Sequence, residues 1–526
     1  MTQIRLIINR QEDSYSAKWI EEGGQESETF PLRLPLGGEA MAEMRWYLEE
    51  FMQFPGTGDR VKAQATERRL KAWGEALFEA IFGTAEGNQV YNNFMRDPEP
   101  RLLTIGTTDA DVLAQPWEMM RDRRGPLAFR GVIIRRQLQG SGMRVSYDFG
   151  LPLRILLIIS RPTDTGFIDP RTSMRPVMDA LDELRGHAEL SFCEPPTFAR
   201  LEEMVSEAKA AKRPFHIVHF DGHGTYLPKT GVGALAFERE DGRSELITGS
   251  RMGDLMSRLN VPLIILEACR SSGLSQKPVF GSVAPALLQS GVGSIVAFSH
   301  AVHIEAARLL VERFYRQLAN GRSVGQALEE GRTRLHANRA RWLHVGPDAP
   351  TIDLQDWFIP QLYQVGRDPI LVPDQTPRVL ETLGVSTASK TLGVSTAPLH
   401  NFPPPPRYRF HGRAPELLAL ERAFRRHNAV LFSGMGGMGK TALAREAAAW
   451  ELRKGTISAA VFHSFEQKAG AERVVQLLGD ALHDGEFSKL TAAKQWETAI
   501  SLFHQQPALL IWDNFGSLGT QGEWKL

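Results

Sequence analysis

The fold of this chain is decided by HIVHFDGHG at residues 216–224 and by LIILEACR at residues 263–270. Each stretch is an apolar run of the kind that forms a buried strand, and each ends in a polar turn. The first turn presents His223 beside Gly224, and the second presents Cys269. Two parallel strands that end side by side would bring the imidazole and the thiol together at the carboxyl edge of a sheet, where open α/β sheets place their sites.

The pairing of a thiol with an imidazole predicts nucleophilic catalysis. A thiol needs a base to become a good nucleophile, and imidazole titrates in the range that supplies one. We therefore expect Cys269 to act as a nucleophile and His223 to be its general base. The alternative is that Cys269 is a small buried hydrophobic residue, since free cysteines are often fully buried. No third, orienting residue is evident from the sequence.

The surrounding sequence alternates strand and helix patterns and predicts an α/β fold. Apolar runs predict strands at 153–159 and 293–298, and amphipathic patterns predict helices at 178–185, 200–212 and 305–319. Continuous apolar strands that alternate with helices are typical of a parallel sheet covered on both faces. We expect a three-layer α/β sandwich over residues 151–370, preceded by an N-terminal α/β part at residues 1–150.

Residues 371–406 are expected to form a linker. The seven residues TLGVSTA occur at 382–388 and again at 391–397, and four prolines follow at 403–406. Consecutive prolines favour an extended polyproline geometry. The repeat is too short and isolated to indicate a solenoid.

The last block, residues 407–526, contains a phosphate-binding motif in the context that such a motif requires. A strand is expected at residues 430–433, GMGGMGKT follows at 434–441, and a helix pattern follows at 442–451. Glycines let backbone N–H groups close around phosphate oxygens. Downstream, the apolar run at 508–513 ends in an acid. The residues expected to contact ATP or ADP are Gly434, Gly436, Gly437, Gly439, Lys440, Thr441 and Asp513.

Three of these residues have distinct expected roles. Lys440 would neutralise the charge of the β- and γ-phosphates, and Thr441 and Asp513 would hold Mg²⁺. The alternative is a glycine-rich turn that binds nothing.

The strand-end motifs resemble a known family. His223-Gly224 and EACR at 267–270 resemble the His-Gly and Gln-Ala-Cys-Arg-Gly signatures of caspases. The fuller resemblance is to the CHAT domain, the caspase-like module of the clan that includes separase and metacaspases, and it extends over roughly residues 100–365. Three further stretches contribute to it, namely QPWEMMRD at 115–122, LLQSGV at 287–292 and FYRQLANG at 314–321.

The resemblance implies a caspase-like fold and peptide hydrolysis by a His223–Cys269 dyad without a cofactor. It also implies that backbone N–H groups of Gly224 and Cys269 hold the oxyanion. In the caspase clan the residues two positions before the dyad lie near the pocket for the P1 side chain. Asp221 and Glu267 are therefore interpreted as binding a basic P1 residue, and the alternative for each is a local salt bridge.

The final block resembles the STAND class of signal-responsive ATPases, which includes the NB-ARC and NACHT families. That resemblance implies a nucleotide switch that regulates the peptidase, oligomerisation through the ATPase part, and a role in bacterial defence or stress signalling. A complete STAND module has further strands, a sensor and a helical lid, and the chain ends shortly after Asp513. We therefore expect nucleotide binding to be weak and leave ATP hydrolysis open. The competing hypothesis is a nucleotide-dependent signalling scaffold whose CHAT-like part mainly binds partners.

Composition narrows the classes of function and partner. Lys+Arg and Asp+Glu are both 61, so the net charge is zero and nothing favours nucleic acid or an anionic membrane as a partner. No apolar run suits a transmembrane helix, and the N-terminus has no signal-peptide pattern. The two cysteines are too few for a disulfide framework or a cysteine-based zinc site, which fits a cytoplasmic protein. A protein substrate is implied by the resemblance to peptidases. Cys193, His216 and His219 are expected to be structural.

Overall fold

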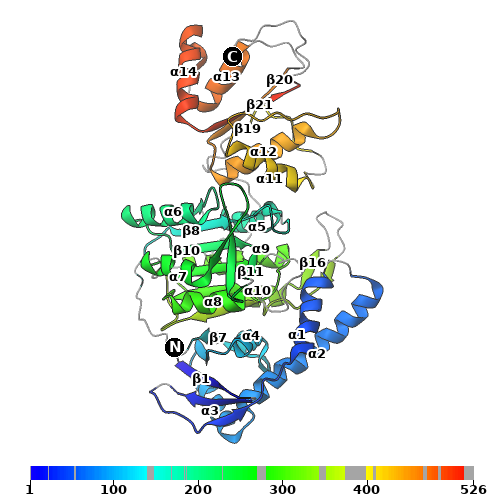
Figure 1. Ribbon diagram of the computed structural model, residues 1–526, viewed down its shortest axis with the longest axis vertical. Coiled ribbons are helices and arrows are strands. Elements are labelled where there is room, and N and C mark those ends of the chain that lie inside the picture. The colour runs from blue at the N-terminus through cyan, green and yellow to red at the C-terminus, as the bar shows by residue number, and fades with distance from the viewer. Residues whose placement is uncertain are drawn as a thin grey trace. The chain divides into compact units, whose positions relative to one another are not determined.

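The structure is a computed structural model, and it divides into two compact units, Met1–Thr382 and Leu383–Leu526 (Figure 1). The division falls within residues 371–406. The structure describes residues 2–12, 14–21, 23–52, 55–138, 147, 149–167, 169–182, 184, 186–227, 229–268, 280–342, 351–372, 399–406, 410, 412–465, 471–483 and 487–514. Cys269 and the TLGVSTA repeat lie outside the described residues.

The first unit is built around an eleven-stranded sheet. From edge to edge its strands are β3 (Phe30–Leu32), β2 (Ser14–Ile20), β1 (Thr2–Gln11), β4 (Arg101–Gly106), β7 (Val132–Gln137), β18 (Pro360–Gln364), β15 (Ser294–Phe298), β14 (Leu263–Ala268), β10 (Ile217–Gly222), β8 (Leu153–Ile159) and β9 (Ala188–Phe192). The strands from β15 to β9 run parallel, and β18 is antiparallel to β15. Strands from residues 1–150 and from residues 151–370 therefore share one sheet.

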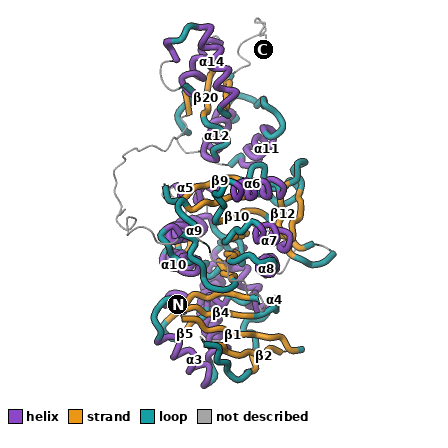
Figure 2. Tube along the Cα trace, turned by 90° about the vertical axis from the view of Figure 1, so that its left-hand side faces the viewer, coloured by secondary structure: helices purple, strands orange, loops and turns teal. Residues whose placement is uncertain are grey.

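Helices cover both faces of the strands that carry the two motifs (Figure 2). One layer consists of α6 (Phe198–Ala210), α7 (Gly249–Arg258) and α8 (Phe280–Gln289). The other consists of α5 (Pro170–Asp182), α9 (Ile304–Ala319) and α10 (Val324–Ala337). This arrangement confirms the predicted three-layer α/β fold. The α5 helix begins earlier than the expected 178–185, because Pro170 has the fixed φ that suits a first helical turn.

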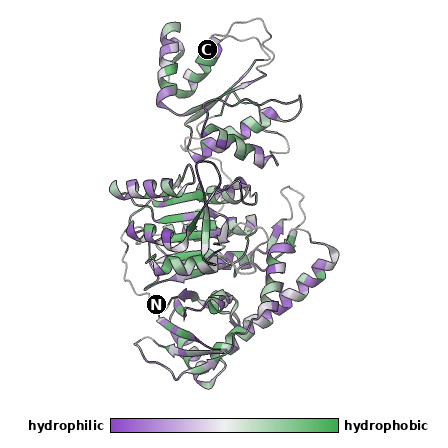
Figure 3. Ribbon diagram, viewed as in Figure 1, coloured by the Kyte–Doolittle hydropathy of each residue, from purple (hydrophilic) through white to green (hydrophobic). Residues whose placement is uncertain are grey.

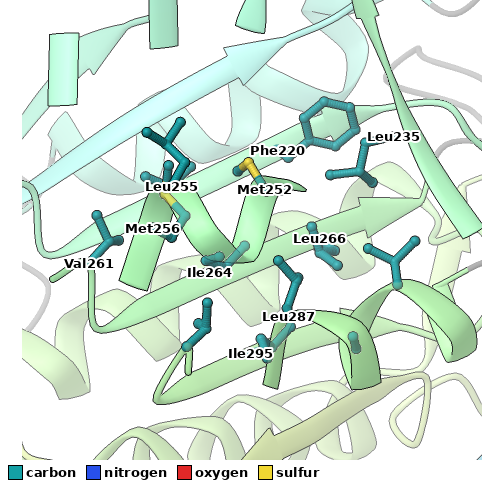
Figure 4. Packing of buried hydrophobic residues seen from close by; sticks show 14 of the residues in the cluster. Phe220, Leu235, Met252, Leu255, Met256, Val261, Ile264, Leu266, Leu287 and Ile295 are labelled. Carbon is teal, nitrogen blue, oxygen red and sulfur yellow. The ribbon is translucent and has the colours of Figure 1, made fainter. Parts of the chain in front are cut away.

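The core beneath α6, α7 and α8 is apolar and tightly packed (Figure 4). It includes Val218, Phe220, Ile264 and Leu266, which are all fully buried. The motif strands appear green in Figure 3, as expected for strands covered on both faces. Because successive side chains of a strand point to opposite faces, His219, Asp221 and Glu267 lie on the face toward α9.

The remaining elements of the first unit frame this sandwich. They are α1 (Gly38–Arg45), η1 (Trp46–Glu50), α2 (Thr57–Phe82), α3 (Ala85–Arg96), α4 (Ala110–Ala114), η2 (Trp117–Met119), β5 (Arg121–Asp122), β6 (Gly125–Pro126), η3 (Leu127–Arg130), β11 (Gly224–Tyr226), β12 (Gly233–Glu238), β13 (Ser244–Thr248), β16 (Ala340–Trp342) and β17 (Thr351–Asp353). The strands β11, β12 and β13 form a separate three-stranded sheet. Its first strand begins immediately after His223, so this small sheet lies at the carboxyl end of β10.

The second unit contains three parallel strands, β19 (Leu399–His400), β20 (Ala459–Ser464) and β21 (Ala508–Asp513). Its helices are α11 (Ala414–Phe424), α12 (Lys440–Lys454), α13 (Ala471–Leu482), η4 (Phe487–Lys489) and α14 (Ala492–Gln505). The expected strand at 430–433 is wrong, since this segment pairs with no strand in the described part of the chain and Leu431 is 83% exposed. An apolar run becomes a strand only when a neighbour satisfies its backbone groups.

Within the described ranges, no helix combines the length and apolar character needed to cross a membrane.

Candidate functional site

The two motif strands are neighbours, as their patterns predict. β10 and β14 pair in parallel, with Gly222 opposite Ala268. The next residues along the chain are His223 and Cys269, so both follow the same edge of the sheet. Cys269 itself lies outside the described residues, and the structure gives no position for its thiol.

His223 is buried and its ring is held by the backbone. Its Nε2 lies 2.6 Å from the carbonyl oxygen of Gly166, in the loop that follows β8. A carbonyl oxygen can only accept, so Nε2 donates, and in the neutral ring the basic lone pair is then on Nδ1. The carbonyl of Gly166 is thus an orienting group for the imidazole. No pattern in the sequence could identify this group, because every residue type carries a backbone carbonyl.

The backbone around His223 is fixed by the small sheet. The carbonyl oxygen of His223 accepts a hydrogen bond from the backbone N–H of Ala236 on β12, at 2.9 Å. Gly224 begins β11 and pairs with Leu235 of β12. Main-chain pairing therefore anchors the histidine and the glycine that follows it.

Asp221 is fully buried and has an internal partner. The guanidinium of Arg161 donates from Nη2 to the Asp221 carboxylate at 2.5 Å, and from Nη1 to the Asp221 carbonyl oxygen at 2.8 Å. The backbone N–H of Arg161 donates to the carboxylate of Glu238, at 3.0 Å. A buried ion pair thus lies two residues before His223.

Glu267 ends a buried hydrogen-bond chain that begins on α9. The hydroxyl of Tyr315 lies 2.9 Å from His219 Nδ1, and His219 Nε2 lies 3.1 Å from the Glu267 carboxylate. Burial raises the pKa of Tyr315 well above its usual range, so the hydroxyl keeps its proton and donates. Burial also raises the pKa of Glu267, against the hydrogen bond from His219 that lowers it, and the nearby charge of Asp221 adds to the rise. The expected structural role of His219 agrees with these contacts.

The other residues expected to be structural also have internal surroundings. His216 Nδ1 accepts a hydrogen bond from the backbone N–H of Arg154 at 3.1 Å, and burial lowers the pKa of His216 to about 4, so the ring is neutral. Cys193 is a buried free thiol whose sulfur lies 3.7 Å from the carbonyl oxygen of Pro195.

The QPWEMMRD stretch forms a buried structural network, in agreement with the interpretation of its Pro-Trp-Glu element as a packing and turn feature. Glu118 accepts hydrogen bonds from Arg136 at 2.6 and 3.0 Å, and from Arg332 at 3.3 Å. All three side chains are fully buried. Trp117 donates from Nε1 to the carbonyl oxygen of Val112 at 2.9 Å.

In the second unit, the GMGGMGKT segment forms a loop that opens α12. Gly437 and Gly439 have φ angles of 78° and 76°, a left-handed conformation that favours glycine. Lys440 begins the helix, and its Nζ donates to the carbonyl oxygens of Gly434 and Met435 at 2.9 and 3.0 Å. Most of this loop is exposed.

Two residues expected to hold Mg²⁺ are brought together although they are 72 positions apart. The hydroxyl of Thr441 donates to the carboxylate of Asp513 at 2.9 Å. A cavity of about 670 Å³ is lined by residues of this loop and of β21, including Lys440 and Asp513. Arg413, which sequence reasoning did not select, donates to the carbonyl oxygen of Met438 at 2.6 Å.

Among the residues that the structure describes, no group of three or more His, Cys, Asp or Glu side chains is arranged to hold a metal ion.

Comparison with known proteins gives one family and several similar structures. The family model of the CHAT domain matches residues 72–365. No curated protein sequence matches the chain.

The similar solved structures are remote in sequence. Separase in the Saccharomyces cerevisiae separase–securin complex has a TM-score of 0.42 and 10% identity, over 69% of this chain and 30% of that chain. This chain thus spans about a third of the length of separase. RgpB of Porphyromonas gingivalis, solved with its pro- and mature domains, has a TM-score of 0.35 and 10% identity, over 64% of this chain and 78% of that chain.

Proposed function

The chain belongs to the CHAT domain family, and we propose that it is a cysteine endopeptidase whose catalytic dyad is His223 and Cys269. The observation that carries this proposal is the parallel register of β10 and β14, with Gly222 opposite Ala268. This register makes His223 and Cys269 the first residues beyond the same sheet edge. The Gly166 carbonyl supports the proposal further, because it holds the protonated nitrogen of the imidazole and leaves Nδ1 as the base.

The reaction needs no cofactor. His223 Nδ1 takes the thiol proton, the Cys269 sulfur bonds to the substrate carbonyl carbon, and the carbon–nitrogen bond then breaks as the leaving amine takes the proton from His223. Water, deprotonated by His223, hydrolyses the thioester and restores the thiol. The backbone N–H groups of Gly224 and Cys269 are proposed to hold the oxyanion, each lowering the barrier by about 3 kcal/mol.

Loss of the dyad tests this mechanism. Cys269→Ala and His223→Ala should each lower peptide cleavage by about 10³-fold or more, and the double variant should lose no more than either single variant, because the two groups act as a unit. Cleavage of a peptide library is the measurement, and Cys193→Ala is the matched thiol control. Retained cleavage in Cys269→Ala would exclude a cysteine peptidase. Normal partner capture by that inactive variant would favour a signalling scaffold.

For the substrate, we propose a protein cleaved after Arg or Lys, with Asp221 and Glu267 as the acidic residues near the P1 side chain. The charge of Asp221 is offset by Arg161, whereas the partner of Glu267 is an imidazole. Glu267 should therefore contribute more to the preference. Because burial raises its pKa, the preference for Arg over Leu should grow as the pH rises and Glu267 ionises.

Glu267→Gln tests the P1 preference. The amide oxygen can still accept from His219, so the variant removes the charge and keeps the hydrogen bond. The ratio of kcat/KM for Arg and Leu substrates should fall and lose its pH dependence. A ratio equal to that of the parent chain at every pH would contradict this role.

For the second unit, we propose that it binds ATP or ADP with Mg²⁺. Backbone N–H groups of Gly434, Gly436, Gly437 and Gly439 would surround the phosphates. The carbonyl oxygens that now accept from Lys440 could be exchanged for phosphate oxygens. The Thr441–Asp513 contact supports their assignment as Mg²⁺ ligands, since both are oxygen donors.

We further propose that this nucleotide site regulates the peptidase in the manner of a STAND switch, with oligomerisation through the second unit, in a cytoplasmic defence or stress pathway. The two cysteines of the chain fit a reducing compartment. The nucleotide site is tested by binding of a fluorescent ATP analogue with Mg²⁺. Lys440→Ala should lower binding at least tenfold, whereas Lys494→Ala on α14 should not change it. Equal binding in both variants would exclude the site.

A further inference from the structure

The loop that orients His223 has contacts of its own. It runs from Ser160 to Phe167 after β8, and it supplies the Gly166 carbonyl that accepts from His223 Nε2. Gly166 is exposed, and so are Thr163 and Asp164. An exposed loop fixes a carbonyl in one direction only where other contacts hold it.

Two neighbouring residues attach this loop to the hairpin between β12 and β13. Thr163 donates twice to the carbonyl oxygen of Gly242, from its backbone N–H at 2.8 Å and from its hydroxyl at 3.1 Å. The carboxylate of Asp164 accepts twice from Ser244, from the backbone N–H at 2.8 Å and from the hydroxyl at 3.0 Å. We call these four hydrogen bonds the strap.

The hairpin end of the strap is well built. Arg239 and Arg243 close the turn, with backbone hydrogen bonds of 2.8 Å from Arg239 N–H to the Arg243 carbonyl and from Gly242 N–H to the Arg239 carbonyl. Gly242 has a φ of 82°, which favours glycine at this position. Asp241 accepts from the backbone N–H of Arg243 at 2.9 Å. The carbonyl of Gly242 is therefore a fixed acceptor.

Asp164 takes part in the strap as an ionised carboxylate. Partial burial acts to raise the pKa of Asp164, but the hydrogen bonds from the hydroxyl and the N–H of Ser244 outweigh it and lower the pKa. The carboxylate is therefore ionised when the dyad works, and it accepts both hydrogen bonds at once.

We propose that Asp164, Ser244 and Thr163 are positioning residues for the general base. They hold the loop against the hairpin so that the carbonyl of Gly166 keeps His223 in the tautomer and orientation that the dyad needs. This inference rests on the proposed role of His223, and it adds residues that act on His223 through the carbonyl of Gly166. A base that turns freely loses catalysis through the wrong tautomer and the wrong position.

The test is a graded series in the full chain. Asp164→Ala removes both hydrogen bonds to Ser244, Ser244→Ala removes one, and Asp164→Asn keeps both because the amide oxygen accepts from the N–H and the amide nitrogen donates to the hydroxyl. We expect kcat to fall about tenfold in Asp164→Ala and about threefold in Ser244→Ala, with KM within twofold of the parent value. Asp164→Asn should retain activity.

A second measurement does not require cleavage. Histidine hydrogen–deuterium exchange followed by mass spectrometry over a pH series gives the pKa of each imidazole separately. An acceptor on Nε2–H favours the charged ring, so Asp164→Ala should lower the pKa of His223. Every variant of the series leaves unchanged the buried ion pair of Asp221 with Arg161, two residues before His223.

Controls separate the strap from simple charge or stability. Asp164→Asn loses the same charge as Asp164→Ala, so a lowered His223 pKa in both would assign the effect to charge and overturn the proposal. Asp254→Ala, an exposed acid on α7, should change neither kcat nor the pKa. An unchanged His223 pKa in Asp164→Ala would also overturn it. If Asp164→Ala lowers the pKa of His223 but the parent chain cleaves no peptide, the role of the strap would be supported and the proposed peptidase activity would be contradicted.

Discussion

The strand-end site of the first unit and the phosphate loop of the second differ in how far apart in the chain their contacts lie. Tyr315 contacts His219 across 96 positions, and Arg161 contacts Asp221 across 60. Lys440 contacts carbonyls only five and six positions before it. The first site is buried and depends on contacts across the fold. In the second site the glycine loop is exposed and the contacts of Lys440 are local, although Thr441 reaches Asp513 across 72 positions. Substitutions at the buried site should therefore lower the stability of the first unit. Substitutions in the phosphate loop should impair its function and change stability only slightly.

The largest effect is expected at Glu118. Glu118→Ala should lower the free energy of unfolding by about 3–5 kcal/mol, because it leaves Arg136 buried without its carboxylate partner and leaves Arg332 with the carboxylate of Glu329 alone. Thermal unfolding of the full chain is the measurement. Glu202→Ala removes an exposed pair with Arg258 and is the matched control, with an expected change within about 0.5 kcal/mol. Equal shifts in the two variants would show that the buried pairs of Glu118 contribute no more stability than an exposed pair.

Glu329 should make stability depend on pH. Burial raises its pKa to about 7, the charge of Glu118 adds to the rise, and the neighbouring Arg332 offsets part of it. Because the folded pKa exceeds the unfolded one, the stability contributed by the protonated form is complete below about pH 4 and is lost as the pH rises to 7. Glu329→Gln should therefore be more stable relative to the parent chain at pH 8 than at pH 5. The gain in unfolding free energy should be larger at pH 8 by about 1–3 kcal/mol, and thermal unfolding at the two pH values measures it. A constant difference between the two pH values would contradict this.

Substitution of Tyr315, which contacts His219 in the buried core, should have a smaller effect on the unfolding free energy. Tyr315→Phe keeps the ring and removes the donor to His219 Nδ1, so it should cost about 1–2 kcal/mol of unfolding free energy. Urea unfolding followed by tryptophan fluorescence measures this cost. Tyr226→Phe on β11 is the control for loss of a partly exposed hydroxyl. A Tyr315→Phe chain as stable as the parent would mean that the Tyr315–His219 contact contributes nothing.

The smallest effect on stability is expected in the phosphate loop. Lys440→Ala removes contacts to two exposed carbonyls and should change the unfolding free energy by no more than about 0.5 kcal/mol, while it should lower nucleotide binding at least tenfold. Calorimetric melting without and with ATP–Mg²⁺ measures both quantities together. Loss of stability comparable to that of Glu118→Ala would show that the loop is part of a core.

The same contrast explains which features the sequence could predict. Strand positions follow from local apolar runs, so β10, β14 and their shared edge were predictable, as were the left-handed glycines before Lys440. Arg161 and the Gly166 carbonyl were not, since they reach the site from a preceding loop, 60 and 57 positions from their partners. Local pattern also misled at 430–433, because strand formation depends on a partner that the pattern does not contain.

The position of β18 in the sheet determines when the sheet can be completed during synthesis of the chain. Pro360–Gln364 pairs antiparallel with β15 and parallel with β7, and among the described strands of the first unit it is the last to leave the ribosome. The N-terminal strands and the strands that precede His223 and Cys269 are therefore not joined into one sheet until nearly the whole unit has been synthesised. A nascent chain that holds both His223 and Cys269 still lacks the strand that closes the sheet. The complete eleven-stranded sheet can therefore form only after β18 has been synthesised.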